Sequence, residues 1–371
     1  MARDRLMSLD VFRGLTIAGM VLVNNPGDWS SIYPPLQHAP WHGLTPTDLI
    51  FPFFLFIVGI SISFALGKRI KNGIGAKIYK KIFKRFAVIF GLGLLINAFP
   101  YFELSTLRIP GVLQRIAVCY LIVSLIFLYT NWKQQTIIAI AALVIYWLLM
   151  SFGTVPGCEV ATISDKACNL SAYLDRYILG EAHIWKLGKV YDPEGILSTI
   201  PAVATTLSGV LCGSWLKTDR TKTERVSGIF FFGLVLLATG WIWSFWFPLN
   251  KALWTSSYVV YTSGAALCFL GACIWLIDLQ GYKLWSKPFI IFGMNALALY
   301  TGAELTARLL DTVRVTNGQA EAISIKTWIF NHIFTPLFSP ANASLAYALF
   351  FVGFWLFLMW LLYRRRIFIK I

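Results

Sequence analysis

Two histidines stand close together in a short polar segment between two long apolar runs of this sequence. They are His38 and His42, and the whole chain contains only four histidines. An imidazole changes its charge near neutral pH, so a histidine at a membrane–water boundary is a candidate proton acceptor. Asp48 opens the next apolar run and is a candidate member of the same site. The alternative is an interfacial histidine that only hydrogen-bonds a loop carbonyl.

Charged side chains inside apolar runs form a second group of candidates, because an ionised group within a membrane is costly and marks function by default. Asp10 and Arg13 lie three positions apart in the first run, on one face of a helix. Arg115 lies early in the fourth run, and Glu304 lies nine positions after Asn295 in the ninth. These charges either neutralise one another inside a bundle or line a polar cavity, where arginines would bind an anionic ligand such as a phosphate-bearing cofactor.

The elements that must hold these residues are long apolar helices. Apolar residues make up 57% of the chain and charged residues 13%, whereas soluble proteins carry about 25% charged residues. No linker divides the chain, so residues 1–371 are predicted to form one all-α integral membrane domain, a bundle of about ten transmembrane helices. The ten apolar runs are centred near residues 16, 56, 95, 120, 145, 205, 236, 267, 297 and 351.

Basic residues are concentrated on one predicted side of this bundle. The loop at about 67–85, the segment after the sixth run and the chain end from Arg364 carry 16 of the 32 lysines and arginines, and Arg3, Arg5, Lys133, Lys283 and Lys287 bring the total on that side to 21. Because cytoplasmic loops carry the Lys/Arg excess, the N- and C-termini are predicted to be cytoplasmic. This topology accounts for the net charge of +15, so no nucleic-acid partner is expected. The predicted outer loops cover about 26–46, 101–110, 155–193, 248–255 and 308–340.

The six cysteines fall into two groups. Cys158 and Cys168 lie in the long outer loop, where an oxidising compartment would let them pair. The other four lie in apolar runs and are expected to serve packing. The sequence has no CxxC pair and no HExxH run, so no metal site is predicted.

Several motifs follow one another along the whole chain. The first are Ser8-Leu-Asp-Val-Phe-Arg-Gly14, Val23-Asn24, His38-Ala-Pro-Trp-His-Gly-Leu44 and Asp48-Leu-Ile-Phe-Pro52. The others are Arg108-Ile-Pro-Gly-Val-Leu-Gln-Arg115, Tyr173-Leu-Asp-Arg176, Tyr191-Asp-Pro-Glu-Gly-Ile-Leu197, Pro248-Leu-Asn-Lys-Ala-Leu-Trp254, Gly293-Met-Asn295 and Tyr363-Arg-Arg-Arg-Ile-Phe-Ile-Lys-Ile371. Together they resemble the motifs of the heparan-alpha-glucosaminide N-acetyltransferases, a family of transmembrane acetyltransferases. These enzymes move acetyl from acetyl-CoA onto a terminal glucosamine, and the resemblance implies the same type of reaction here.

The resemblance implies catalytic roles at the outer mouth. His38 matches the family's catalytic histidine, which would take a proton from the acceptor amine. Asn24 matches its active-site asparagine, which could hydrogen-bond the developing oxyanion, and Asp48 is predicted to belong to the same group. His42 departs from the family pattern, in which an asparagine stands, and is the weaker candidate. Direct transfer and an acetyl-histidine intermediate are both compatible with the sequence.

For the donor, the resemblance implies acetyl-CoA as co-substrate. Arg13 and Arg115 match family arginines, and Asp10 and Asn295 are grouped with them as predicted acetyl-CoA-binding residues. The family's outer loop also carries two cysteines, which supports the expected pair. The implied partners are acetyl-CoA, an amino-sugar acceptor and the lipid bilayer, and a homodimer is expected. The resemblance begins after the lysosomal enzyme's lumenal N-terminal domain, and it implies a compact bacterial member in the inner (cytoplasmic) membrane.

The expected reaction moves acetyl from cytoplasmic acetyl-CoA to a glucosamine-like amino sugar on the outer side. Two other classes fit ten spans with buried charges. One is a secondary transporter of a sugar or lipid-linked precursor, although the sequence has no evident inverted repeat. The other is a polysaccharide O-acyltransferase. Binding of acetyl-CoA separates the enzymes from the transporter, and amine versus hydroxyl products separate the two enzymes.

Overall fold

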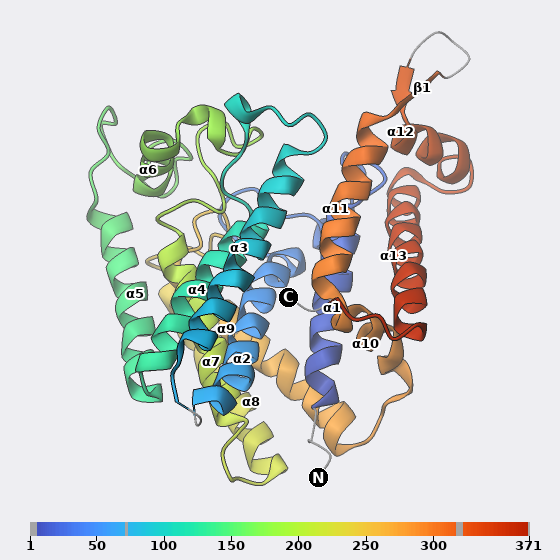
Figure 1. Cartoon of the computed structure of the whole chain (residues 1–371). Helices are drawn as coiled ribbons and strands as arrows, with labels where there is room; N and C mark the ends of the chain where they lie inside the picture. The colour runs from blue at the N-terminus through green and yellow to red at the C-terminus, as the bar shows by residue number, and fades with distance from the viewer. Residues whose placement is uncertain (1–5, 71–72, 317–321, 370–371) are drawn as a thin grey trace.

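The computed structural model describes residues 6–70, 73–316 and 322–369. Figure 1 shows these residues as a bundle of helices with one short antiparallel hairpin, β1 (Arg314–Thr316) and β2 (Ala322–Ser324). The all-α fold predicted from the sequence is confirmed. The helices are α1 (Met7–Asn24), α2 (Ile50–Ile70), α3 (Ala76–Ala98), α4 (Val112–Tyr129), α5 (Trp132–Phe152), α6 (Leu170–Leu179), α7 (Thr199–Trp215), α8 (Lys222–Trp243), α9 (Ser256–Cys273), α10 (Lys287–Met294), α11 (Ala296–Thr312), α12 (Ile325–Ile329) and α13 (Pro340–Arg364).

Each of the ten predicted apolar runs lies in a helix of this bundle. Within the described residues, seven helices are long and apolar enough to cross a membrane, and an eighth span would be the α10–α11 pair, which is bent by 74°. The other two runs lie in α3, whose first half is strongly basic, and in α7, which has only 17 residues. The multi-pass membrane fold therefore stands, while ten spans and cytoplasmic termini stay predictions.

The basic loop predicted at about 67–85 is mostly helical, which corrects that boundary. α2 continues to Ile70 and α3 begins at Ala76. Ile78 and Ile82, four positions apart, are buried against the bundle, while the basic side chains between them face outward. The high charge of this segment conceals its helical period, and for that reason the sequence predicts a loop.

Glycines bring α1 and α10 into close contact. A Cβ atom on Gly14 of α1 would lie 1.8 Å from the backbone oxygen of Phe289 in α10. A Cβ atom on Gly293 of α10 would lie 2.3 Å from the backbone oxygen of Asp10 in α1. Side chains at these positions would push the two helices apart, as is common where small residues line a membrane helix interface. The backbone around Asp10 is therefore held against the end of α10.

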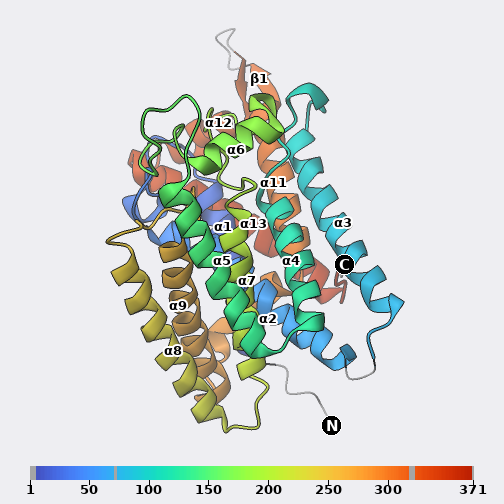
Figure 2. The same ribbon diagram turned by 90° about the vertical axis from the view of Figure 1, so that its left-hand side faces the viewer.

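The bundle has two different ends. Figures 1 and 2 show α6, α12 and β1 at one end, and the start of α1 with the loop before α8 at the other. α13 runs back towards the end at which α1 begins (Figure 1). We call the end with α6 and β1 the outer end and the opposite one the inner end, following the predicted orientation.

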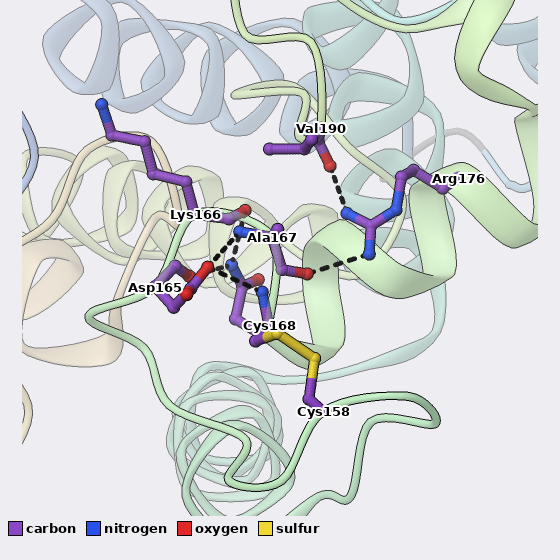
Figure 3. The surroundings of a disulfide bond; sticks show 8 residues. Cys158, Asp165, Lys166, Ala167, Cys168, Arg176 and Val190 are labelled. Carbon is purple, nitrogen blue, oxygen red and sulfur yellow. Dashed lines mark hydrogen bonds between the residues drawn. A yellow bond between two sulfur atoms is a disulfide. The ribbon is translucent and has the colours of Figure 1, made fainter.

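The predicted cysteine pair of the long outer loop is confirmed. Cys158 and Cys168 form a disulfide, and their Cα atoms are 5.9 Å apart. Figure 3 shows that the turn before Cys168 is closed by Asp165, whose Oδ1 accepts the backbone N–H groups of Ala167 at 2.7 Å and Cys168 at 3.0 Å. Arg176 of α6 donates to the carbonyl oxygen of Ala167 at 2.9 Å. The disulfide loop is thereby attached to α6.

Candidate active site

A cavity of about 540 Å³ lies at the outer end, between the loop of residues 26–46, the outer halves of α1 and α11, and the loops before α4, α7 and α9. We call it the outer cavity. It brings together all three residues predicted to be catalytic. Its polar and aromatic lining residues are Asn24, His38, Trp41, Thr47, Asp48, Phe51, Asn97, Arg108, Trp185, Tyr191, Glu194, Lys251, Tyr300, Glu304 and Arg308.

His38 and Asp48 form a hydrogen-bonded pair in this cavity. Nδ1 of His38 lies 2.7 Å from Oδ1 of Asp48, whose side chain is only 1% exposed. Thr45 and Asp48 make a capping box at the turn Pro46–Leu49, so Oδ2 of Asp48 accepts the backbone N–H of Thr45 at 3.0 Å. The same oxygen accepts the N–H of Ala39 at 3.1 Å. When Nδ1–H is assigned as the donor to Asp48, Nε2 is the ring nitrogen that can accept a proton.

Lys251, in the loop between α8 and α9, brings a positive charge to this pair. Its Nζ lies 3.0 and 3.2 Å from the two ring nitrogens of His38 and 3.7 Å from Oδ1 of Asp48. Burial lowers the pKa of the Lys251 ammonium, and the charge of Asp48 opposes that shift. The imidazole therefore lies between a carboxylate and an ammonium group, and both restrict its orientation.

Asn24, the last residue of α1, connects the outer cavity to α11. Its Nδ2 donates to Oε1 of Glu304 at 3.2 Å, which leaves one N–H of the amide for a ligand. Arg308, one turn further along α11, also lines the cavity and donates to the backbone oxygen of Phe99 at 3.5 Å. The end of α1 thus presents an amide donor beside a carboxylate.

A bidentate ion pair forms part of the cavity wall. Arg108 donates to the two carboxylate oxygens of Asp192 at 2.8 and 2.6 Å and to Glu194 at 2.5 Å. Arg108 and Glu194 line the cavity, and Asp192 is buried behind them. Such paired, charge-assisted hydrogen bonds are strong and directional. They join the segment before α4 to the segment before α7.

Three aromatic side chains add a largely apolar surface to the same wall. Trp41 packs edge-on against Tyr191, with ring centroids 5.0 Å apart, and Trp185 packs against Tyr191 at 5.9 Å. All three line the outer cavity. The cavity therefore combines fixed charges with a flat apolar surface, as small-molecule sites commonly do.

Arg115 lies behind this wall and is not among the residues that line the outer cavity. Its side chain is buried, and its Nη2 donates to the backbone oxygen of Gly195 at 2.9 Å and to the hydroxyl of Ser198. Its guanidinium carbon is 5.3 Å from the ring centroid of Trp254. Nε and Nη1 have no hydrogen-bond partner among the described residues. A role for Arg115 in acetyl-CoA binding stays a prediction.

The other three residues predicted to bind acetyl-CoA gather at the inner end. Arg13 donates to Asp10 at 3.5 Å, to the backbone oxygen of Gly293 at 3.4 Å and to the hydroxyl of Ser61 at 3.3 Å. Asn295 follows directly after α10. Next to these residues is a second cavity of about 610 Å³, the inner cavity, lined by Met7, Asp10, Ile290, Met294, Tyr363, Arg364, Arg366 and Phe368.

Asn295 holds the chain end beside the inner cavity. Its Nδ2 donates to the backbone oxygen of Ile367 at 3.1 Å, and its Oδ1 accepts the backbone N–H of Ile369 at 2.9 Å. Arg366 has a φ of +56°, a left-handed value that turns the chain back after α13. Phe368, between the two anchored residues, lines the cavity. Both hydrogen-bonding groups of the Asn295 amide are therefore engaged by the protein.

His42, the second histidine of the opening segment, is not among the residues that line the outer cavity. Its Nε2 lies 3.3 Å from the hydroxyl of Ser164, and its Nδ1 lies 3.3 Å from Nδ2 of Asn250. Burial lowers the pKa of its imidazole. His42 therefore joins two outer loops, whereas His38 faces the cavity.

The sequence did not assign a role to several residues of the outer cavity. Three of them, Lys251, Arg108 and Glu194, lie within motifs that carry the family resemblance. Their position in these motifs is the sequence feature that could have identified them as site residues. Glu304 was noted as an intramembrane charge without a role in the site. Trp185 had no signal, because only tertiary packing brings it to Tyr191.

The outer cavity thus holds an imidazole in contact with a buried carboxylate, a nearby amide donor and an aromatic wall. These parts suit general-base catalysis of acyl transfer, in which a donor group stabilises the developing oxyanion. Within residues 6–70, 73–316 and 322–369, no group of three or more histidine, cysteine or acidic side chains is arranged to hold a metal ion.

Comparison with known proteins finds similarity to one enzyme family. The family model described as "Heparan-alpha-glucosaminide N-acetyltransferase, catalytic" matches residues 5–240. The chain is 29% identical over 364 residues to the mouse heparan-alpha-glucosaminide N-acetyltransferase, and the match covers 81% of this chain and 54% of the mouse protein. It is 30% identical over 363 residues to the human protein of that name, covering 81% of this chain and 53% of the human one. The chain spans about half the length of these curated relatives.

Proposed function

The chain belongs to the heparan-alpha-glucosaminide N-acetyltransferase family, and on this premise we propose that it is an acetyltransferase that acts across a membrane. Its donor is acetyl-CoA from the cytoplasm, and its acceptor is the amine of a terminal glucosamine-like sugar on the outer side. The observation that carries the proposal is the His38–Asp48 pair, with a contact of 2.7 Å, in a cavity that also contains Asn24.

In the proposed reaction, His38 is the general base. Asp48 holds the Nδ1–H of the imidazole, so Nε2 takes a proton from the acceptor nitrogen, whose lone pair then attacks the thioester carbonyl. The free N–H of Asn24 donates to the oxyanion that develops on the thioester oxygen; such a donor is worth roughly 2.7–4 kcal/mol in other enzymes. Transfer is direct, within a complex of both substrates.

The donor is proposed to enter from the inner end. The inner cavity offers Arg364 and Arg366 for the phosphates of CoA, with Arg13 one turn along α1 from Asp10. α1 connects the two cavities, since Asp10 lines one and Asn24 the other. Fourteen residues of helix separate them, roughly 21 Å at 1.5 Å per residue. The acyl arm of the donor would extend along α1 to reach His38.

Labelled acetyl-CoA and a panel of amino sugars test the proposal on the purified protein. Labelled N-acetyl product is expected, and His38→Ala should remove it while His42→Ala retains it. Label on a sugar hydroxyl would favour the O-acyltransferase instead. Sugar uptake into proteoliposomes without transfer of label would favour the transporter. A burst of acetylated enzyme in the absence of acceptor would replace direct transfer by an acetyl-histidine intermediate.

The cellular setting is also a proposal. The basic inner end and the family resemblance support a multi-pass protein of the inner membrane with both termini in the cytoplasm, acting as a homodimer. Reporter fusions after Lys222 and after Lys189 should report inside and outside, respectively. The reverse result would contradict the orientation, and a single subunit in native mass spectra would contradict the dimer.

A further inference from the structure

Three carboxylates line the outer cavity, and their partners differ. Asp48 is paired with His38 at 2.7 Å, and Glu194 is paired with Arg108 at 2.5 Å. Among the described residues, no basic side chain comes within 4 Å of the Glu304 carboxylate. The Asp48 and Glu194 carboxylates each have a cationic side chain within 4 Å, Lys251 and Arg108 respectively, although Arg108 is shared with Asp192. Glu304 has no such partner among the described residues.

Glu304 accepts a hydrogen bond from a neutral amide, and the charge of Arg308 acts on its carboxyl group only from beyond 4 Å. Its Oε1 accepts a hydrogen bond from Asn24 at 3.2 Å, while its Oε2 receives none from the described residues. Arg308 follows four positions later on α11 but donates to the backbone oxygen of Phe99 at 3.5 Å. A carboxylate removed from bulk water is costly unless a cation or hydrogen-bond donors compensate it. A cationic ligand in the outer cavity would supply this missing partner.

We propose that Glu304 binds the ammonium group of the acceptor and so selects primary amines. Asn24 fixes Oε1, and Oε2 is directed to the ligand. This inference rests on the proposed function and deepens it, because it defines the acceptor as a cationic amino sugar recognised before deprotonation. A hydroxyl acceptor of the same shape would leave the charge of Glu304 unpaired, and such mismatches give strong discrimination.

The assignment is consistent with the proton balance of the transfer. The bound ammonium gives one proton to Nε2 of His38, which frees the nitrogen lone pair. The nitrogen–carbon bond then forms and the carbon–sulfur bond breaks. The second proton of the nitrogen goes to the departing thiolate, so the products are the acetamide, the CoA thiol and protonated His38. Glu304 keeps its charge throughout and acts in binding.

Glu304→Gln tests this role, because it keeps the size of the side chain and an oxygen for Asn24 while removing the charge. Loss of a charge-assisted hydrogen bond corresponds to about 10- to 100-fold weaker binding. Equilibrium binding of glucosamine, without donor, should weaken by that factor, and the KM for glucosamine should rise similarly. The preference for glucosamine over glucose should fall, while acetyl-CoA affinity stays unchanged. The matched control is Asp311→Asn, two turns along α11, where the carboxylate is 58% exposed and lies 3.9 Å from Lys326.

Unchanged glucosamine binding in Glu304→Gln would overturn the inference. If that variant also fails to bind acetyl-CoA, the pH dependence of glucosamine binding to the wild-type protein is the test instead. The affinity for glucosamine should fall as the pH rises and the amine loses its proton. An affinity that is constant with pH would overturn the inference. Charge-dependent glucosamine binding without acetyl transfer would support the inference and reject the proposed function. Acetyl transfer to glucosamine together with glucosamine binding that does not depend on Glu304 would support the proposed function and overturn the inference.

Discussion

The two cavities at the ends of α1 hold their charges in different ways. In the outer cavity, ion pairs join segments that are distant in sequence, such as Arg108 with Glu194 at 2.5 Å and Lys251 with Asp48 at 3.7 Å. The inner cavity takes its charges from the start of α1 and from the chain end, where Arg364 and Arg366 lie two positions apart.

We infer from this difference that the outer cavity carries out the acetyl transfer and that the inner cavity binds the donor. Charges fixed by partners on several segments keep one geometry, which a transition state requires. A cluster of arginines at the inner end provides attraction for an anion without such geometric demands. On this basis, changes in the outer cavity should affect turnover, and changes in the inner cavity should affect donor affinity.

His38→Ala is the largest expected effect. Loss of a general base typically reduces a rate by about 10²–10⁴-fold, so labelled product should fall by that factor. Affinity for acetyl-CoA should stay close to wild type, because a base acts mainly in the transition state. Single-turnover measurements with saturating donor separate the two quantities.

His42→Ala is the matched control, since His42 lies in the same segment but contacts Ser164 and Asn250 instead of the cavity. Its turnover should remain within a few-fold of wild type. Equal losses of turnover in His38→Ala and His42→Ala would mean that the whole segment is needed for activity. The distinction between His38, which faces the cavity, and His42, which joins two loops, would then not hold.

Arg115→Ala should mainly reduce stability. The side chain is buried and donates to Gly195 and Ser198, and hydrogen bonds from charged groups contribute about 1.5–3 kcal/mol each. Thermal unfolding in detergent should therefore show a loss of about 3 kcal/mol with nearly unchanged acetyl-CoA affinity. The opposite pattern, weaker donor binding at normal stability, would support the donor-binding role predicted from the sequence.

The sequence predicted what depends on local pattern. Apolar runs predict the helices, and the motifs predict that His38, Asn24 and Asp48 belong to one site, as their shared cavity confirms for their proximity. Lys251 could not be paired with His38 from the sequence, because 213 positions separate them and only tertiary packing brings them together. The same applies to Asn295, whose amide binds the chain end at Ile367 and Ile369.

Changing Arg364 and Arg366 together to Gln tests the inner cavity. If these arginines attract the phosphates of CoA, the Kd for acetyl-CoA should rise about tenfold, or about 1.4 kcal/mol, while the KM for the amino sugar is unchanged. Arg365→Gln is the control, because Arg365 is not among the residues lining the cavity. Equal effects of the two changes would indicate general attraction by the basic chain end rather than a site.

The last expected effect is on stability alone and concerns the support of the outer wall. Asp175 of α6 is buried, and its Oδ1 accepts the backbone N–H of Ile196 at 2.8 Å, close to the cavity residue Glu194. Burial raises the pKa of the Asp175 carboxyl to about 7. The folded protein therefore keeps this proton between about pH 4 and 7, where the carboxyl of an unfolded chain has already lost it.

The Asp175 carboxyl therefore makes its full contribution to the free energy of unfolding below about pH 4. This contribution is lost as the pH rises towards 7, by at most about 1.4 kcal/mol per pH unit. Asp175→Asn retains an acceptor for Ile196 but cannot ionise. The difference in unfolding free energy between the variant and wild type should therefore grow in favour of the variant from pH 5 to pH 7 and stay level above pH 8. A constant difference would mean that Asp175 is already ionised in the folded protein, and the outer wall would then be supported by a charge facing Arg115.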